Sequence, residues 1–298
     1  QPDDSDRLLY AGDNYDTANG LMDPVTNVRI AYRGATIIEG SLEDLSIMFA
    51  ALSHWQPGFL IERDADNQAR AVTVPLCLGR KPYDPMECFP ATRRGELIMQ
   101  VTLALPDAQF DNIILQAETI ELLEAVPQRF TKITTISTVH NAAGDHDIEL
   151  PISNDILGVM LHSRVAPGIS TYATNFGRVR LQVDNVETMF SETNWETLHG
   201  ELVRKLGHNL DVRYHNHFKI VGPPVPDDYT EGQVDDSPLA TRYAYLDMDP
   251  LEDGQYALRT AGAARVNLRV TDDIGNANAV RILPVELVQL GTPAGPGA

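Results

Sequence analysis

The chain has 298 residues, of which 43% are hydrophobic and 22% charged, a composition typical of a globular protein with one large β domain or two of ordinary size. Its 42 acidic residues against 23 Lys and Arg give a formal net charge of −19. Duplex DNA requires a basic face, so we expect no direct contact with nucleic acid. No apolar run approaches the roughly 18 residues of a transmembrane helix, and the first residues lack the basic and apolar regions of a signal peptide.

The N-terminal part of the chain is predicted to form short strands around one helix. Residues 1–24 are acidic and rich in turn-forming residues, so we expect an arm or loop. A helix is predicted over 41–55, because Ser41 can cap its first turn and apolar residues recur at helical spacing. Alternating apolar residues between turn signals predict strands at 28–32, 35–39, 58–62, 70–78, 96–105 and 112–123.

The C-terminal part shows a similar mixture. A second helix is predicted over 194–206, with Asn194 as its cap. Polar residues with Gly or Pro predict loops at 140–147 and 225–238. Strands are predicted at 130–139, 148–152, 155–163, 242–249, 264–271 and 279–290, with either one long strand or a bent pair at 178–190.

This pattern predicts four parts along the chain. They are an N-terminal arm over 1–24, a first β domain over 25–126, a second over 127–290, and a flexible tail over 291–298. Two β domains with short strands, long loops and one helix each suggest sandwiches of the jelly-roll type. The helices are too few for a parallel α/β fold.

Two stretches of the chain repeat one pattern about 165 residues apart, DPMECFPATRRGELIMQVTL from Asp84 and DPLEDGQYALRTAGAARVNLRVT from Asp249. Each begins with Asp-Pro, passes through a small-residue turn and ends in an alternating strand. Each follows a predicted helix and precedes a β-rich segment, 113–123 or 280–290. The order of elements favours an internal duplication. The alternative is that two β-rich halves share turn chemistry by chance, since Asp-Pro is a common turn opener.

The same stretches carry a family resemblance. The run RYAYLDMDPLEDGQYALRTAGAARVNLRVT followed by AVRILPVELV resembles the C-terminal barrel of the double jelly-roll major capsid proteins of tailless icosahedral DNA viruses and phages. VTVPLCLGRKPYDPMECFPATRRGELIMQVTL is similar to the end of their first barrel. GDHDIELPISNDILGVMLHSR is similar to the opening of the second.

The resemblance implies an all-β fold of two jelly-roll barrels in tandem, each with one short inserted helix. It also implies a structural protein of the virion without enzymatic activity. Such a subunit assembles in the host cytoplasm into homotrimeric, pseudo-hexagonal capsomers. These pack beside neighbouring capsomers and a separate vertex, or penton, protein, over an internal membrane.

One departure from the family pattern concerns the length of the first barrel. Only about 41 residues precede the first helix, against about 66 between Pro127 and the second helix. The first barrel must therefore be abbreviated, or its early strands lie within residues 7–40 without a recognisable strand pattern. A single jelly roll with an N-terminal elaboration stays open as the alternative fold.

A histidine pair provides a weak metal-site candidate. His215 and His217 alternate within DVRYHNHF, so both face one way if this segment is a strand. Such a pair can bind a transition metal, with His208 or Asp211 as a third ligand. The alternative is a polar surface strand or a subunit contact.

Asp247 and Asp249, with Glu252 and Asp253, form a second weak metal candidate. They fail the EF-hand pattern, which needs Gly at position six and Glu at position twelve. We expect at most a structural divalent cation held here at a contact between subunits.

The sequence contains no motif of nucleophilic, nucleotide-dependent or zinc-dependent catalysis. We therefore predict no catalytic or cofactor-binding residue. Trp55 and Trp195 are expected to pack in the core, and Cys77 and Cys88 to be buried thiols. The rival interpretation is a secreted β-sandwich that binds carbohydrate or acts on glycans, since some glycosidases place carboxylate pairs on β-sandwiches.

Overall fold

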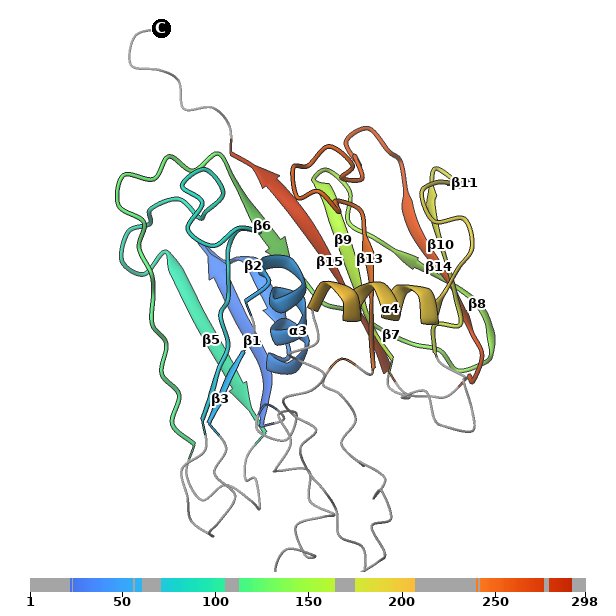
Figure 1. Ribbon diagram of the computed structural model, residues 1–298, viewed down its shortest axis with the longest axis horizontal. Coiled ribbons are helices and arrows are strands. Elements are labelled where there is room, and N and C mark those ends of the chain that lie inside the picture. The colour runs from blue at the N-terminus through green and yellow to red at the C-terminus, as the bar shows by residue number, and fades with distance from the viewer. Residues whose placement is uncertain are drawn as a thin grey trace, which may run out of the picture.

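The computed structural model describes residues 22, 24–55, 57–60, 71–104, 113–163, 175–206, 240, 242–275 and 279–290. Within these residues the chain forms an eight-stranded sheet, a five-stranded sheet, a two-stranded hairpin and two helices of 12 residues each. The larger sheet lies in the middle, with the first helix against one face and the smaller sheet against the other, and the second helix contributes residues to the cores on both sides (Figure 1).

We refer to residues 25–126 as the N-terminal unit and to residues 127–290 as the C-terminal unit, whose described strands pair as in a jelly roll. Its strands are β6 (Arg129–Ile133), β7 (Ile136–Val139), β8 (Gly144–Glu149), β9 (Asp155–His162), β10 (Arg178–Val183), β11 (Val186–Glu187), β12 (Thr193–Asn194), β13 (Tyr243–Asp247), β14 (Val266–Asp272) and β15 (Ala279–Gln289). β15 pairs with β6 and β7, β14 with β8, β13 with β9, and β11 with β10, all antiparallel. The first strands of the unit thus pair with the last strand, the next strand pairs with the last but one, and the pairing continues in this nested way to β10 and β11. This nested antiparallel pairing is that of a jelly roll, which consists of two Greek keys.

The N-terminal unit, residues 25–126, repeats one part of this arrangement. It contains β1 (Val25–Tyr32), β2 (Ala35–Gly40), α3 (Leu42–Ser53), β3 (Gly58–Leu60), β4 (Ala71–Thr73) and β5 (Leu97–Leu103). The order β2-β1-β5 matches the order β11-β10-β14, and a helix follows β2 as α4 (Trp195–Leu206) follows β12. Among the described residues of this unit, no strand corresponds to β8 or β9. Within the described residues, the N-terminal unit therefore shows only part of the jelly-roll arrangement.

The first helix follows its predicted start closely. Ser41 is the N-cap, and its hydroxyl accepts a hydrogen bond from the backbone N–H of Asp44 at 3.1 Å. The helix ends where His54 adopts the left-handed conformation, with φ of 58°. Every residue from Asp44 to Ser53 is buried, because α3 lies between the two units instead of on the surface.

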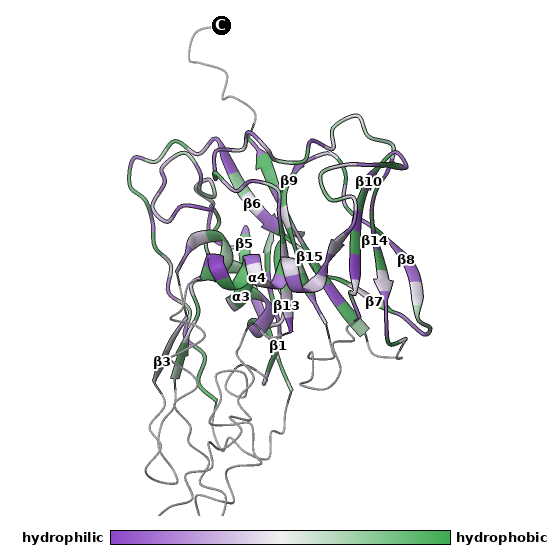
Figure 2. Ribbon diagram, turned by 45° about the vertical axis from the view of Figure 1, so that its right-hand side comes forward, coloured by the Kyte–Doolittle hydropathy of each residue, from purple (hydrophilic) through white to green (hydrophobic). Residues whose placement is uncertain are grey.

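Two hydrophobic cores hold the layers together. One fills the C-terminal jelly roll between its two sheets and includes Val159 and Trp195. The other joins both units and includes Phe49 from α3 with Met160 and Leu283 from the large sheet. Neighbouring residues of β9 contribute to different cores, so this strand is buried on both faces. Figure 2 shows apolar residues concentrated along these central strands.

Two predicted elements are wrong. Residues 113–122 form no strand, although 112–123 has a strand-like sequence, because no described strand lies in hydrogen-bonding register beside it. The predicted loop at 140–147 instead contains the start of β8. Its polar residues pair across to β14: Thr271 donates to Asp145 at 2.7 Å, and Arg269 donates to Asp147 at 2.7 Å.

Other expectations are confirmed with adjusted bounds. The segment 178–190 is the bent pair, because Asp184 and Asn185 both have positive φ and turn the chain between β10 and β11. The predicted strand at 130–139 is broken into β6 and β7. Asn194 lies directly before α4, at the end of β12.

The predicted loop 225–238, the tail and nearly all of the arm lie outside the described residues. No helix among the described residues is long and apolar enough to cross a bilayer.

Candidate functional site

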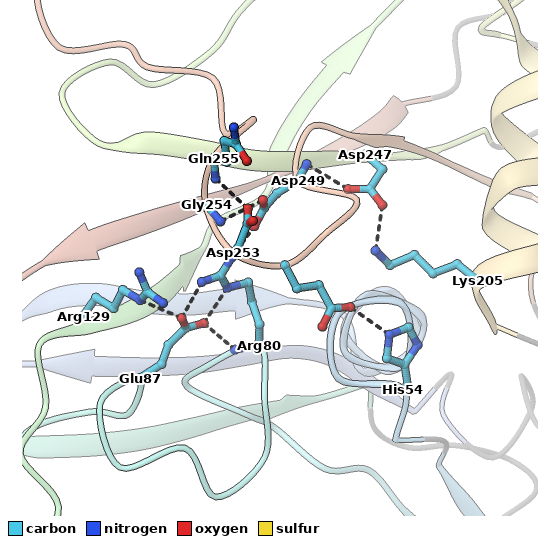
Figure 3. Close-up of polar contacts among 11 residues, drawn as sticks. His54, Arg80, Glu87, Arg129, Lys205, Asp247, Asp249, Asp253, Gly254 and Gln255 are labelled. Atoms are coloured by element: carbon cyan, nitrogen blue, oxygen red, sulfur yellow. Dashed lines mark hydrogen bonds and ion pairs between the residues drawn. The ribbon is translucent and has the colours of Figure 1, made fainter.

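A buried ion cluster brings the two repeated Asp-Pro motifs together. We call Arg80, Glu87, Arg129 and Asp249 the junction cluster; Glu87 closes the first motif and Asp249 opens the second. The Arg80 guanidinium lies between both carboxylates (Figure 3). The side chains of Arg80, Glu87 and Asp249 are no more than 3% exposed, whereas that of Arg129 is 30% exposed, so the cluster is buried at its centre and reaches solvent at Arg129.

Glu87 holds most of the hydrogen bonds of the junction cluster. Arg80 donates to it from Nε at 2.7 Å, from Nη2 at 2.6 Å and from the backbone N–H at 2.8 Å. Arg129 donates a further bond from Nε at 2.8 Å. Gly79 allows this approach, because a Cβ there would lie 1.9 Å from the Glu87 carbonyl oxygen.

The two carboxylates of the junction cluster share one guanidinium unequally. Burial would raise the pKa of Glu87, but the hydrogen bonds and charge of Arg80, with the charge of Arg129, hold this pKa below its ordinary value. Burial raises the pKa of Asp249, and the Gly254 N–H and Arg80 offset this only in part. Asp249 receives a single Arg80 contact, from Nη1, which explains the difference.

Two further polar contacts lie beside the junction cluster: the His54 contact links the two units, and the Lys205 contact links α4 to β13 within the C-terminal unit. Nε2 of His54, at the end of α3, lies 2.8 Å from Glu252, which closes the second motif. Lys205 of α4 forms an ion pair with Asp247 at 2.7 Å. A cavity of about 10 Å³ between these groups is large enough for one water at most. The geometry is that of a structural joint, since this cavity cannot hold a substrate.

A second buried cluster, the Asp44 cluster, connects α3 to the large sheet. Asp44 accepts a hydrogen bond from the Tyr243 hydroxyl at 2.8 Å and forms an ion pair with Arg281, whose Nε lies 2.7 Å from Oδ2. His162 Nδ1 lies 2.7 Å from Asp44 Oδ1 and 2.6 Å from Arg281 Nη2. Since a guanidinium only donates, His162 Nδ1 either accepts from Arg281 or donates to Asp44.

The electrostatics of the Asp44 cluster favour the ionised carboxylate. Burial would raise the pKa of Asp44, but His162, Arg281 and Tyr243 together hold it below its ordinary value. Burial, followed by the charge of Asp44, raises the pKa of Tyr243 well above its ordinary value. The four residues come from α3, β9, β13 and β15, so this cluster ties the N-terminal helix to the C-terminal sheet.

The predicted site residues divide into two groups. Asp247 and Asp249 are described, and both are engaged by cations, Lys205 and Arg80. Within the described part of the chain, no three His, Cys, Asp or Glu side chains gather as metal ligands would. His208, Asp211, His215 and His217 lie outside the described residues, so their metal site stays a prediction.

Other side chains of interest are also placed. Trp195 is buried in the core as predicted, whereas Trp55 is half-buried against Tyr83 at a ring distance of 5.3 Å. Cys77 and Cys88 are free thiols, and both are half-buried.

Sequence reasoning missed the cations of both clusters. Arg80 lies in a turn-rich run, and Arg281 lies in a strand where an isolated charge usually faces solvent. The one available signal, for Arg80 alone, was the repeated Asp-Pro-x-Glu motif, since an acidic residue that becomes buried needs a cation or hydrogen-bond donors beside it.

No protein-family model matches this chain, and no curated protein matches it either. Solved structures do match it. The major capsid protein of STIV, the Sulfolobus turreted icosahedral virus, aligns with a TM-score of 0.53 and 13% identity over 92% of this chain and 81% of that one. The PBCV-1 virus capsid chain aligns with a TM-score of 0.50 and 9% identity over 89% of this chain and 80% of that one.

The major capsid protein P2 of bacteriophage PM2 aligns less well, with a TM-score of 0.46 and 13% identity over 92% of this chain and 85% of that one. The fold conclusion rests on the first two matches and on the strand pairing. The fold of this chain is the double jelly roll of those proteins.

Proposed function

We propose that this chain is a major capsid protein, a structural subunit without enzymatic activity. The observation that carries the proposal is the jelly-roll pairing of the C-terminal unit, partly repeated in the N-terminal unit and joined to it by buried ion clusters. Two β units that buried ion pairs hold in a fixed arrangement suit a subunit that packs side by side with other copies in a shell. The STIV and PBCV-1 chains of the same fold come from viral capsids.

The finer parts of the proposal follow the family pattern. Two barrels in one chain give pseudo-two-fold symmetry, so three copies approximate a hexagon. We infer a homotrimeric capsomer that packs beside neighbouring capsomers and a vertex protein, over an internal membrane. Assembly would take place in the host cytoplasm. The acidic surface, with its net charge of −19, supports a shell that does not contact nucleic acid directly.

Two further proposals concern the units and ions. We infer unit boundaries near 25, 127 and 290, which agree with the change from the N-terminal sheet strands to β6. A divalent cation near Asp247 and Asp249 would have to compete with Lys205 and Arg80. Such a cation, or one at His215 and His217, would stabilise contacts between subunits.

The solution mass of the purified full chain tests the proposed function. Light scattering behind a sizing column, with electron microscopy of the same peak, should find about three times 32.8 kDa or larger curved or sheet-like assemblies. Because some capsid subunits trimerise only during assembly, salt and calcium are varied. A monomer under every condition that binds a glycan array would overturn the proposal in favour of a carbohydrate-binding module.

A further inference from the structure

An amine and a carboxamide meet at one buried carboxylate of the large sheet. The carboxylate is that of Glu286 in β15, whose side chain is 2% exposed. Lys132 of β6 donates from Nζ to its Oε1 at 2.7 Å. Asn154, directly before β9, donates from Nδ2 to its Oε2 at 2.7 Å. We call these three residues the Glu286 site.

The register of the sheet brings the Glu286 site together. Lys132 of β6 and Ile156 of β9 both lie opposite Glu286, on its two sides. Asn154 is two residues before Ile156, and its carbonyl oxygen accepts a hydrogen bond at 2.6 Å from the hydroxyl of Thr260, a residue that is 1% exposed. β6 and β9 are two strand spacings apart, roughly 10 Å. A long lysine side chain and a shorter asparagine can span this distance together.

The three groups of the Glu286 site are those that an exchange of amides requires. A lysine amine attacks a carbonyl carbon only after it loses a proton, and a carboxamide nitrogen leaves readily only after it gains one. A carboxylate in contact with both nitrogens can accept the first proton and donate the second. Transfer of a proton from Lys132 to Glu286 also replaces two charges by two neutral groups, which burial favours.

We propose that Lys132 and Asn154 form an amide cross-link within the chain, with Glu286 as the catalytic base and acid. The lone pair of the neutral Lys132 amine forms a bond from Nζ to Cγ of Asn154, and the bond from Cγ to Nδ2 breaks. Nζ gives up two protons, and Glu286 passes both to Nδ2. The nitrogen departs as ammonium, the carboxylate is regenerated, and the reaction needs no oxidant, reductant or other reactant.

Another lysine of the same unit provides a matched comparison. Lys205 Nζ also lies 2.7 Å from a carboxylate oxygen, that of Asp247. The other oxygen of Asp247 accepts the backbone N–H of Asp249 at 3.0 Å, so the place that a carboxamide holds in the Glu286 site is taken there by the main chain. We therefore expect no cross-link at Lys205.

Mass spectrometry of the purified full chain, incubated folded at neutral and mildly alkaline pH, tests the cross-link. We expect the intact mass to be lower than that of the sequence by one ammonia. After trypsin, residues 130–164 should remain one peptide, because an amidated lysine at 132 is not a trypsin site. A second cut after Glu149 should give two chains joined as a branched peptide, since Lys132 and Asn154 lie on opposite sides of this cut.

Three variants identify the source of the lost ammonia. An asparagine can also release ammonia by closing a ring with the next residue, here Asp155. Lys132→Arg retains the positive charge beside Glu286 and this ring closure, but it lacks the reactive amine and should give no branched peptide. Glu286→Gln retains both reacting groups and should also give none. Lys205→Arg should give the branched peptide in the same yield as wild type.

The outcomes decide the cross-link separately from the proposed function. A wild-type protein that keeps the full mass of its sequence would overturn the inference, as would a mass loss that persists in Lys132→Arg and yields no branched peptide. The branched peptide of wild type supports the inference even where a variant does not fold. The bond forms within one chain, so a protein that never assembles can carry it, and its absence leaves the capsid proposal unchanged.

Discussion

Arg80 and Asp249 lie 169 residues apart in the chain, yet their side chains form a buried ion pair between the two β units. Arg80 also binds Glu87, so one guanidinium neutralises a carboxylate from each copy of the repeated motif. The stability of the whole molecule therefore depends on a contact that neither unit contains alone.

Replacing Arg80 should strongly destabilise the protein. Arg80→Met leaves Glu87 and Asp249 buried with less compensation, and we expect a loss of about 3–5 kcal/mol in the free energy of unfolding. Urea unfolding followed by circular dichroism measures it. Arg33→Met is the control, because its ion pair with Glu96 is exposed to solvent and contributes little to stability. Equal losses in the two variants would show that the junction cluster has no special role.

The Asp44 cluster should make the protein sensitive to acid. The pKa of Asp44 is lower in the folded protein than its ordinary value of 3.8. Its contribution to stability is therefore complete above that value and is lost as the pH falls through the lower, folded pKa. Asp44→Asn should be less stable at neutral pH and lose less stability between pH values of about 5 and 2. Unfolding curves recorded over a series of pH values measure this, with the exposed Glu196→Gln variant as control. The same dependence of the unfolding free energy on pH in wild type, Asp44→Asn and Glu196→Gln would contradict the prediction.

His140 should give a second pH dependence at milder acidity. Its ring is 1% exposed. Burial, followed by charge repulsion from the neighbouring His146, lowers the pKa of His140 from 6.5, although Asp272 opposes the shift. The folded state thus resists protonation, so its stability falls as the pH drops below about 6.5. Melting temperatures near pH 7.5 and 5.5 should differ more for wild type than for His140→Asn. His54→Asn, at an exposed histidine, should behave as wild type does.

Two glycines should respond in opposite directions to alanine. A Cβ at Gly158 in β9 would lie 2.1 Å from the Tyr245 hydroxyl and 2.8 Å from the Leu246 carbonyl oxygen, so Gly158→Ala forces a buried strand to shift. A Cβ at Gly200 in α4 meets nothing within 4 Å. We expect Gly158→Ala to lose more than about 1 kcal/mol and Gly200→Ala to gain about 1 kcal/mol. Thermal melts of both variants, compared with wild type, measure these changes. A Gly158→Ala variant more stable than wild type would show that β9 shifts to accept a methyl group without loss of packing.

Local patterns were enough to predict both helices and most strands. Ser41 and the apolar spacing after it predict α3, because capping and periodicity involve only neighbouring residues. The strand predicted over 112–123 rested on the same local reasoning and was wrong, because a strand also needs a neighbouring strand, which local sequence does not specify. The junction cluster could not be predicted, since Arg80 meets Asp249 only after the two units fold together. Asp249 was noted as a weak metal candidate, and the structure shows its ion pair with Arg80, which the sequence did not predict.

The large sheet passes from one unit into the other, because β2 pairs in parallel with β6 where Ile38 meets Ile133. Thr135 of the second unit also donates a hydrogen bond to the Glu39 carbonyl oxygen at 2.8 Å. Bending between the units would break this ladder and open the shared core. The molecule therefore has no internal hinge at this seam, and any closed shell built from it must take its curvature from the angles at which separate molecules meet.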